Sequence, residues 1–301
     1  MSMRISTPHM YRENVDVMLD RQAKLTETEM QMATGKKILK ASDDPAAAVR
    51  ILDLNESQRK LDQYMRNADF AQAHLELEES ILGNMGNLLQ RVRELAVQGN
   101  NDTMSTENRQ AIAEEINEHL DAYMELVNTK APNGEYLFSG FKSQTQPFTH
   151  DGAGTFTYHG DTGQRNLKIG DAREVATGDP GSIFTNLSAS GGGTTNVGEI
   201  IYDLAIAFEA GNSSAVALTD LDTALGQVLN TRASIGSRLS AVDDQNTANE
   251  AFKIAVTNVK SNLEDVDYAE AISRFQQQLA ALQASQQSFL KIQGLNLFNY
   301  L

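Results

Sequence analysis

The sequence predicts a mainly α-helical protein. We expect long antiparallel helices, in a coiled coil or bundle formed by both chain ends, with a small β-rich domain inserted in the middle. Two observations predict this fold class. None of the five prolines in the 301 residues lies between residues 46 and 131 or after residue 180. Since an interior proline costs about 3 kcal/mol, such stretches permit long helices. Within them, apolar residues recur every seven positions, as in helices that pack lengthwise.

The first long helix is expected to start at "SDDP", residues 42–45. Pro45 disfavours helical geometry at Asp44, which suits a helix N-cap, and Pro45 itself fits the first helical position. Asp43 and Asp44 would also face the positive end of the helix dipole. We therefore interpret Asp43, Asp44 and Pro45 as a helix cap at a domain junction. A pair of catalytic carboxylates is the less favoured interpretation.

After this start, one side of the expected helix is marked by residues seven positions apart. They are Leu54, Leu61, Ala68, Leu75, Leu82, Leu89 and Ala96, and a companion row holds Tyr64, Ala71, Glu78, Met85 and Val92. The stretch "VQGNNDT" (97–103) interrupts the pattern, with Gly99 as a C-terminal cap. A second helix is expected to begin near Ser105 and to end before Pro132.

The second half of the chain repeats this pattern after a different middle. Residues 141–197 are rich in Gly, Thr and Asn, and "GTFTYHG" (154–160) alternates like a strand, which predicts the β-rich insert. From Leu221 the seven-residue steps read Val228, Ile235, Val242, Asn249, Val256 and Leu263. Asn249 is the polar member, and a lone polar residue in such a row usually sets the register.

Both ends of the chain carry apolar stripes that need a covering surface. We predict an assembly interface there, partly shared with pairing between the ends. Its residues are Met18, Leu25, Met32, Ile272, Phe275, Leu279, Leu282, Phe289, Leu297 and Phe298. The expected domains are a terminal coiled coil (1–42 and 264–301), a helical domain (43–140 and 198–263) and the outer β-rich domain (141–197). We also expect these ends to be disordered in the isolated monomer.

Composition and charge exclude several classes of protein. The net charge of −15 argues against nucleic acid as a partner, because phosphate binding needs a basic surface. The two ends are together neutral, so the middle of the chain carries this charge. The absence of cysteine excludes disulfides and thiolate zinc sites. With no apolar run long enough to insert into a membrane and no cleavable signal, we expect either a cytoplasmic protein or export without a cleaved signal.

Candidate chemistry is weak, and we expect no catalytic, cofactor-binding or metal-binding residue. Glu115 and His119 are four residues apart, a spacing that could hold a metal, but no second histidine joins them. Four further polar residues gather in the insert, where loop polarity explains them: His150, Asp151, His159 and Asp161. A metal-dependent enzyme built on these four residues is an alternative, but the sequence contains no H-E-x-x-H motif.

Several separated motifs resemble bacterial flagellin and its relatives, in the same order along the chain. They are "MRIST" near the start, "TGKKILKASDDPAAAVRILDL" (34–54), "LLQRVRELAVQGNNDTMSTENRQAIAEEINEHLDAYMELVNTKAPNGEYLFSG" (88–140) and the final "ALQASQQSFLKIQGLNLFNYL". The resemblance covers residues 1–148 and 198–301. "SDDP" and "GEYLFSGFKSQTQPF" (134–148) are closer to the family's hook–filament junction proteins than to filament flagellins.

This resemblance implies an extracellular structural protein of the flagellum, secreted through the flagellar type III export channel. It would form a homo-oligomeric ring at the hook–filament junction. There it would join hook-associated protein 1 to flagellin and template the growing filament. An export chaperone would hold the C-terminal segment. A filament-forming flagellin is the main alternative, and a cytoplasmic coiled-coil scaffold of unrelated origin is a weaker one.

Overall fold

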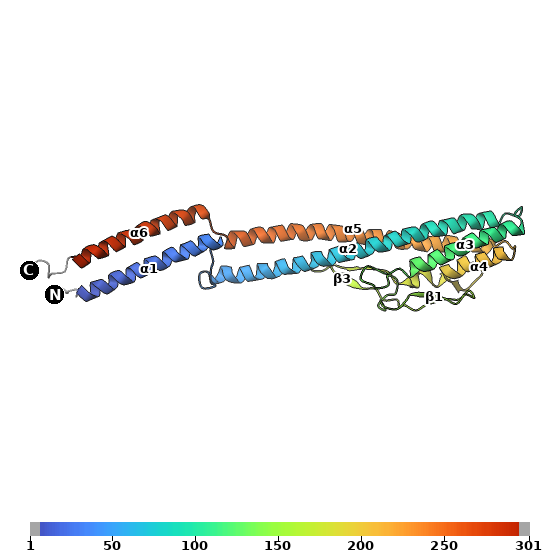
Figure 1. The fold of residues 1–301 in the computed structure, drawn as a ribbon, viewed down its shortest axis with the longest axis horizontal. Helices are drawn as coiled ribbons and strands as arrows, with labels where there is room; N and C mark the ends of the chain where they lie inside the picture. Colours follow the sequence, from blue (N-terminus) through green and yellow to red (C-terminus); the bar gives the residue numbers. More distant parts are fainter. Residues whose placement is uncertain (1–6, 295–301) are drawn as a thin grey trace, which may run out of the picture. The chain divides into compact units, whose positions relative to one another are not determined.

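The computed structural model describes residues 7–294, which are mainly helical (Figure 1). This confirms the predicted fold class. The helices of the described region are α1 (Thr7–Thr34), α2 (Pro45–Gly99), α3 (Thr106–Val127), α4 (Val197–Glu209), α5 (Ala215–Glu264) and α6 (Tyr268–Gly294). The predicted Leu297 and Phe298 lie outside the described residues.

The chain divides into two compact units, each made of segments that are distant in sequence. One unit comprises residues up to 60 together with residues from 252 onward, and the other comprises residues 61–251. Helices α2 and α5 contribute to both units because each crosses one of these boundaries. The division into three domains made from the sequence stays a prediction.

In the 61–251 unit, α2, α3, α4 and α5 lie side by side around one hydrophobic core (Figure 1). The predicted seven-residue rows face this core. The buried members of the first α2 row are Ala68, Leu75, Leu82, Leu89 and Ala96, and those of its companion row are Ala71, Glu78, Met85 and Val92. On α5 they are Leu221, Val228, Ile235, Val242 and Asn249. Apolar side chains at these steps bury one continuous side of each long helix, which favours lengthwise packing.

Local caps set the ends of the shorter helices. The side chain of Ser105 accepts the N–H of Asn108 and caps α3, which begins close to the predicted position. Helix α4 begins with a capping box, in which Asn196 and Glu199 each accept the other's backbone N–H. Such reciprocal bonds satisfy two N–H groups that have no partner within the helix.

The insert contains short antiparallel hairpins and no continuous sheet. Strand β1 (Phe148–His150) pairs with β2 (Phe156–Tyr158), β3 (Asn166–Lys168) with β4 (Glu174–Ala176), and β5 (Leu187–Ser188) with β6 (Thr194–Thr195). The 3₁₀-helix Gly181–Phe184 follows β4. Aromatic rings join the insert to the helices, including an edge-to-face contact of Phe156 on β2 with Tyr202 on α4 at 6.4 Å between centroids.

Candidate assembly interface

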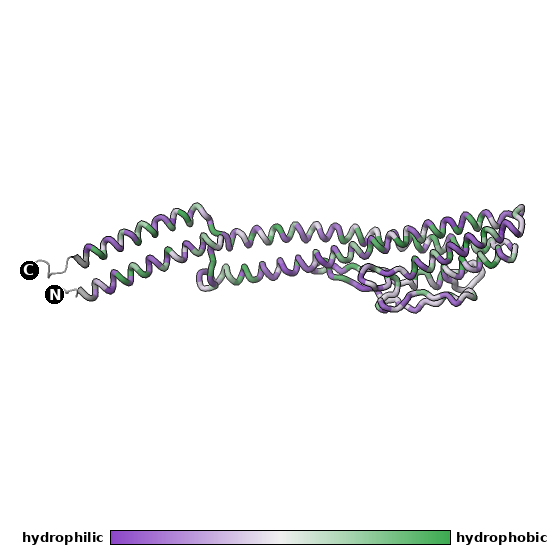
Figure 2. The backbone as a smooth tube through the Cα atoms, viewed as in Figure 1, coloured by the Kyte–Doolittle hydropathy of each residue, from purple (hydrophilic) through white to green (hydrophobic). Residues whose placement is uncertain are grey.

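Helices α1 and α6 form an antiparallel pair whose seam is rich in polar side chains. The guanidinium of Arg21 donates to the carbonyl of Ala281 at 2.6 Å and to the hydroxyl of Ser285. Three turns further along α1, Gln31 accepts a bond from Arg274 at 3.5 Å. Among the described side chains of α1, only Thr28 and Gln31 are buried. Figure 2 shows hydrophobic and hydrophilic residues alternating along both helices.

The predicted interface residues separate into two groups in the structure. Six are half-buried: Met18, Leu25, Met32, Phe275, Leu282 and Phe289. Among these, Phe289 packs against Tyr11 of α1, with ring centroids 5.1 Å apart. Ile272 and Leu279 are instead 44% and 37% exposed, one beside the other on α6 at a spacing of seven residues. The first group therefore serves the α1–α6 seam, and the second stays uncovered in the single chain.

Further exposed apolar side chains on α1 and α6 were missed by the sequence reasoning, among them Val17 at 47%, and three others follow a regular spacing. Leu19 and Met30 are 56% and 43% exposed, and Leu290 is 65% exposed. Leu19 and Met30 are eleven residues apart, about three helical turns, on the side of α1 opposite Arg21 and Thr28. Leu290 follows Leu279 at the same spacing. The sequence could have revealed these residues through this eleven-residue spacing, which returns a side chain to the same side of a helix. We call Leu19, Met30, Ile272, Leu279 and Leu290 the outer apolar residues.

The two aspartates of "SDDP" cap two different segments. The Oδ1 atom of Asp44 accepts the N–H of Ala47 at 2.9 Å, and α2 begins at Pro45. The Oδ2 atom of Asp43 instead accepts the N–H groups of residues 39 and 40, at 3.0 and 2.8 Å. Asp43 thus closes the loop before the helix, while Asp44 starts the helix itself.

Two backbone hydrogen bonds join the segment between α1 and α2 to the segment between α5 and α6. The N–H of Lys37 donates to the carbonyl of Glu264 at 2.7 Å, and the N–H of Val266 donates to the carbonyl of Gly35 at 2.9 Å. The Glu264 carboxylate pairs with the ammonium of Lys36, and this hydrogen-bonded contact raises the pKa of Lys36. Gly35 has φ +71°, a conformation that favours glycine.

The polar residues of the insert do not converge on a reactive centre. His150 stacks on Phe156 with ring centroids 4.2 Å apart, and His159 shares a hydrogen bond with the hydroxyl of Thr149 at 2.8 Å. Asp151 and Asp161 each accept two backbone N–H groups in separate turns, which lowers the pKa of both carboxyls. Within the described part of the chain, no three His, Cys, Asp or Glu side chains are grouped so as to hold a metal ion.

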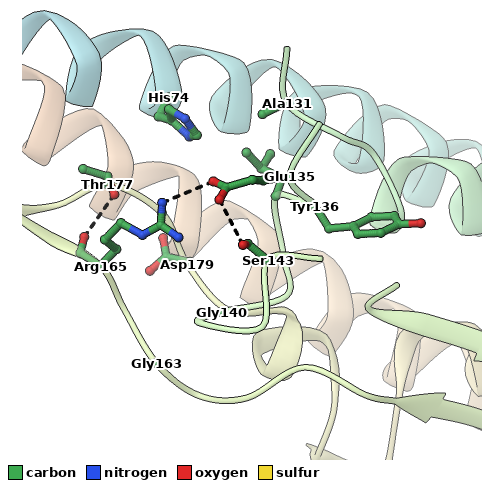
Figure 3. A pocket seen from close by; sticks show the side chains of 12 residues that line it. His74, Ala131, Glu135, Tyr136, Gly140, Ser143, Gly163, Arg165, Thr177 and Asp179 are labelled. Carbon is green, nitrogen blue, oxygen red and sulfur yellow. Dashed lines mark hydrogen bonds and ion pairs between the residues drawn. The ribbon is translucent and has the colours of Figure 1, made fainter. Parts of the chain in front are cut away.

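A small cavity lies between the insert and α2 (Figure 3), with a volume of about 50 Å³. On its wall, the Glu135 carboxylate accepts bonds from Arg165 at 3.2 Å and from the hydroxyl of Ser143 at 3.0 Å. His74 also lines it, and burial, followed by the charge of Arg165, lowers the pKa of this histidine. Ligand sites usually enclose several hundred Å³, so this cavity has room for water but not for an organic substrate.

None of the described helices combines the length and apolar character needed to cross a membrane. Comparison with protein families gives two matches. Residues 5–143 match the bacterial flagellin N-terminal helical region, and residues 218–301 match the bacterial flagellin C-terminal helical region. The first match covers α1, α2 and α3, the second covers most of α5 and all of α6, and most of the insert and α4 lie outside both.

Individual relatives extend the similarity over the whole chain. Flagellar hook-associated protein 3 of Escherichia coli (strain K12) is 32% identical over 98% of this chain and 99% of its own length. A flagellin of Listeria monocytogenes is 25% identical over 83% of this chain and 81% of its own. The crystal structure of flagellar hook-associated protein 3 from Legionella pneumophila has a TM-score of 0.66 at 20% identity, covering 71% of this chain and 98% of that one, and supports the fold. Because both flagellin helical regions match and a relative is similar over nearly its full length, the chain belongs to the bacterial flagellin family.

Proposed function

We propose that this protein is a structural junction protein of the bacterial flagellum, which joins the hook to the flagellin filament and templates filament assembly. One observation carries the proposal: the similarity to hook-associated protein 3 covers 98% of this chain and 99% of that relative, including the insert. Filament flagellins match a smaller part of the chain: the Listeria flagellin is 25% identical over 83% of it, and the Clostridium tyrobutyricum flagellin is 32% identical over only 37%. The chain would act as an adaptor and not as an enzyme.

The outer apolar residues are the surface through which copies would associate. They are exposed in the single chain, although leucine, isoleucine and methionine gain roughly 1.5–3 kcal/mol each on full burial. The neutral ends allow many copies to approach closely, while the net charge of −15 lies in the middle of the chain. We expect a ring of copies that contacts hook-associated protein 1 on one side and flagellin on the other.

The proposed location is extracellular, at the hook–filament junction, after secretion by flagellar type III export. The absence of cysteine in the sequence is compatible with this route. A chaperone would cover the C-terminal apolar residues before export, since an uncovered apolar helix face favours aggregation.

The test is deletion of the gene in the source bacterium, followed by electron microscopy of the cell surface and a blot of the medium for flagellin. We expect complete hooks without filaments and flagellin free in the medium. Normal or merely shortened filaments would contradict the junction role and favour a dispensable flagellin, the alternative supported by the Listeria relative.

Complementation then tests the outer apolar residues. The double variant Ile272→Glu, Leu279→Glu should be secreted but should leave the hooks without filaments. The matched control is Gln277→Glu, an exposed position on another side of α6, which should restore filaments. Restored filaments with the double variant would show that these two side chains do not form the interface.

A further inference from the structure

A buried carboxyl occupies a position in α2 where the heptad pattern calls for an apolar residue. Glu78 lies one step before Met85 and one after Ala71, both fully buried, and its own exposed fraction is 0%. Its Oε1 atom accepts the N–H of Asp179 at 2.9 Å, while its Oε2 atom is buried without a hydrogen-bond partner. An ionised carboxylate with one bare oxygen is costly in such a site, whereas a protonated one is tolerated.

The immediate surroundings hold two carboxyls and one guanidinium. Asp179, itself buried, pairs with Arg238 of α5 and accepts the amide of Gln164 at 2.6 Å. The Nε atom of Arg238 is also buried and has no partner. If both carboxyls were ionised, the cluster would carry an uncompensated negative charge, and Glu78 is the member without an ion pair. Burial, followed by the charge of Asp179, raises the pKa of Glu78 to about 8.

Other charged groups near the cluster already have partners or are neutral near pH 7. On α2, Glu79 accepts two bonds from Arg232 of α5, at 3.0 and 2.5 Å. In the insert, Arg165 pairs with Glu135. His74, one turn before Glu78, has a lowered pKa and is therefore neutral in this range. Asp179 and Arg238 are thus the charges that act on Glu78.

The cluster lies where the end of β4 meets α2 and α5. The segment after β4 is attached through the N–H of Asp179, and the carbonyl of Ala176 accepts a bond from Arg238 at 3.4 Å. At the other end of the same hairpin, Asn67 donates to the carbonyl of Lys168 at 2.7 Å. From α5, Asn249 donates to the neighbouring carbonyl, that of Ile169, at 2.8 Å. These polar bonds fix the β3–β4 hairpin on the two long helices.

We propose that Glu78, Asp179 and Arg238 form a proton-controlled latch, which holds the segment 166–181 on α2 and α5 while Glu78 is protonated and loosens it when Glu78 ionises. Ionisation places two carboxylates beside each other in the core and leaves a charged Oε2 without a partner, and this cost exceeds the gain from a stronger bond to the N–H of Asp179. The segment can relieve that cost only by moving away and admitting water. The helical core that does not touch the cluster keeps its structure. This latch is independent of the proposed junction role.

The test is amide hydrogen exchange of the full chain at pH 6 and pH 9, followed by mass spectrometry and corrected for the intrinsic pH dependence of exchange. We expect peptides from 166–181 to lose at least tenfold in protection at pH 9, while peptides from α3 change little. In Glu78→Gln, a neutral side chain of the same shape, protection of 166–181 should be the same at both pH values.

The matched control is Glu79→Gln, the neighbouring carboxyl that faces Arg232, and it should keep the wild-type pH dependence. A wild-type chain with equal protection of 166–181 at pH 6 and pH 9 would overturn the latch. A Glu78→Gln variant that still loses protection at pH 9 would also overturn it, because the controlling group would then lie elsewhere.

Discussion

At the scale of single residues, Gly99 shows how one missing side chain allows two helices to meet. The sequence marks it as a helix C-cap, but its structural role is a close approach. A Cβ atom at this position would lie 2.3 Å from the ring of Phe208, which is fully buried on α4. The last turn of α2 can therefore contact α4 only with glycine at this position.

We predict that Gly99→Ala lowers the free energy of unfolding by about 1–3 kcal/mol, because the ring of Phe208 must shift within a packed core. Urea unfolding followed by circular dichroism at 222 nm measures it. Gly226→Ala is the matched control, since that helical glycine has open space around it and alanine should stabilise by about 0.5–1 kcal/mol. Equal effects at the two positions would contradict the packing explanation.

Glu78 gives a second residue-scale prediction, this time for global stability. Its folded-state pKa of about 8 exceeds the ordinary 4.5. Between these values the unfolded chain is ionised while the folded chain keeps its proton. The free energy of unfolding therefore falls as pH rises, by up to about 1.4 kcal/mol per pH unit. Below pH 4.5 Glu78 is protonated in both the folded and the unfolded chain, so it no longer lowers the free energy of unfolding.

Glu78→Gln should therefore match the wild type near pH 4.5 and exceed its stability by up to about 4 kcal/mol near pH 8.5. Urea unfolding at a series of pH values measures the difference. Glu79→Gln should show no such divergence, because Glu79 is partly exposed and paired with Arg232. Parallel pH profiles for wild type and Glu78→Gln would show that Glu78 ionises normally in the folded chain.

At the scale of elements, the two aspartates at the start of α2 stabilise different segments: Asp44 the helix and Asp43 the loop before it. We predict that Asp44→Ala removes the cap of α2 and costs about 1 kcal/mol locally, seen as faster amide exchange at Ala47 by NMR. Asp44→Asn should restore most of the protection. Asp43→Ala should leave Ala47 protected and expose the N–H groups of residues 39 and 40 instead. Identical exchange patterns for the two alanine variants would refute this division.

The long helices and their caps could be predicted because their signals are local or strictly periodic. A proline after an aspartate, or leucines seven residues apart, specify geometry without knowledge of the partner. In the insert, the strand-like stretch 154–160 contains β2, but its partner β1 and the other two hairpins could not be placed, since strands of two or three residues show too little alternation. The polar Asn249 was interpreted as a register residue within the helices, but its side chain binds the carbonyl of Ile169 in the insert.

The candidate interface was predicted only in part, for a related reason. Periodicity marks the apolar face of a helix but does not say how much of that face one partner covers. In α6 the face is wide enough for Phe275 to contribute to the seam while Ile272 stays exposed. Glu78 was visible as the one charged member of an apolar row. Its significance depended on Asp179, which is 101 residues away in sequence.

At the scale of the whole molecule, the two units differ in what stabilises them. The 61–251 unit buries a continuous set of large apolar side chains, among them Leu75, Leu82 and Phe208. Among their described side chains, α1 buries only the polar Thr28 and Gln31, and α6 buries only Ala271. Helices in proteins gain most of their stability from packing of an apolar face against a partner. The α1–α6 pair should therefore open much more easily than the core of the other unit.

We predict that trypsin cleaves the dilute monomer first within α1 and α6, at Arg12, Arg21 and Arg274, while Arg93 and Arg109 in the 61–251 unit stay intact. The guanidinium of Arg109 donates to the carbonyls of Gly99 and Gly211, both at 2.9 Å, so cleavage there requires opening of the core. Limited proteolysis with mass spectrometry gives the order of cleavage. Raising the protein concentration should protect the ends if copies cover the outer apolar residues. Ends that resist trypsin in dilute solution would mean that the polar seam alone stabilises the pair, and that copies are not needed to order it.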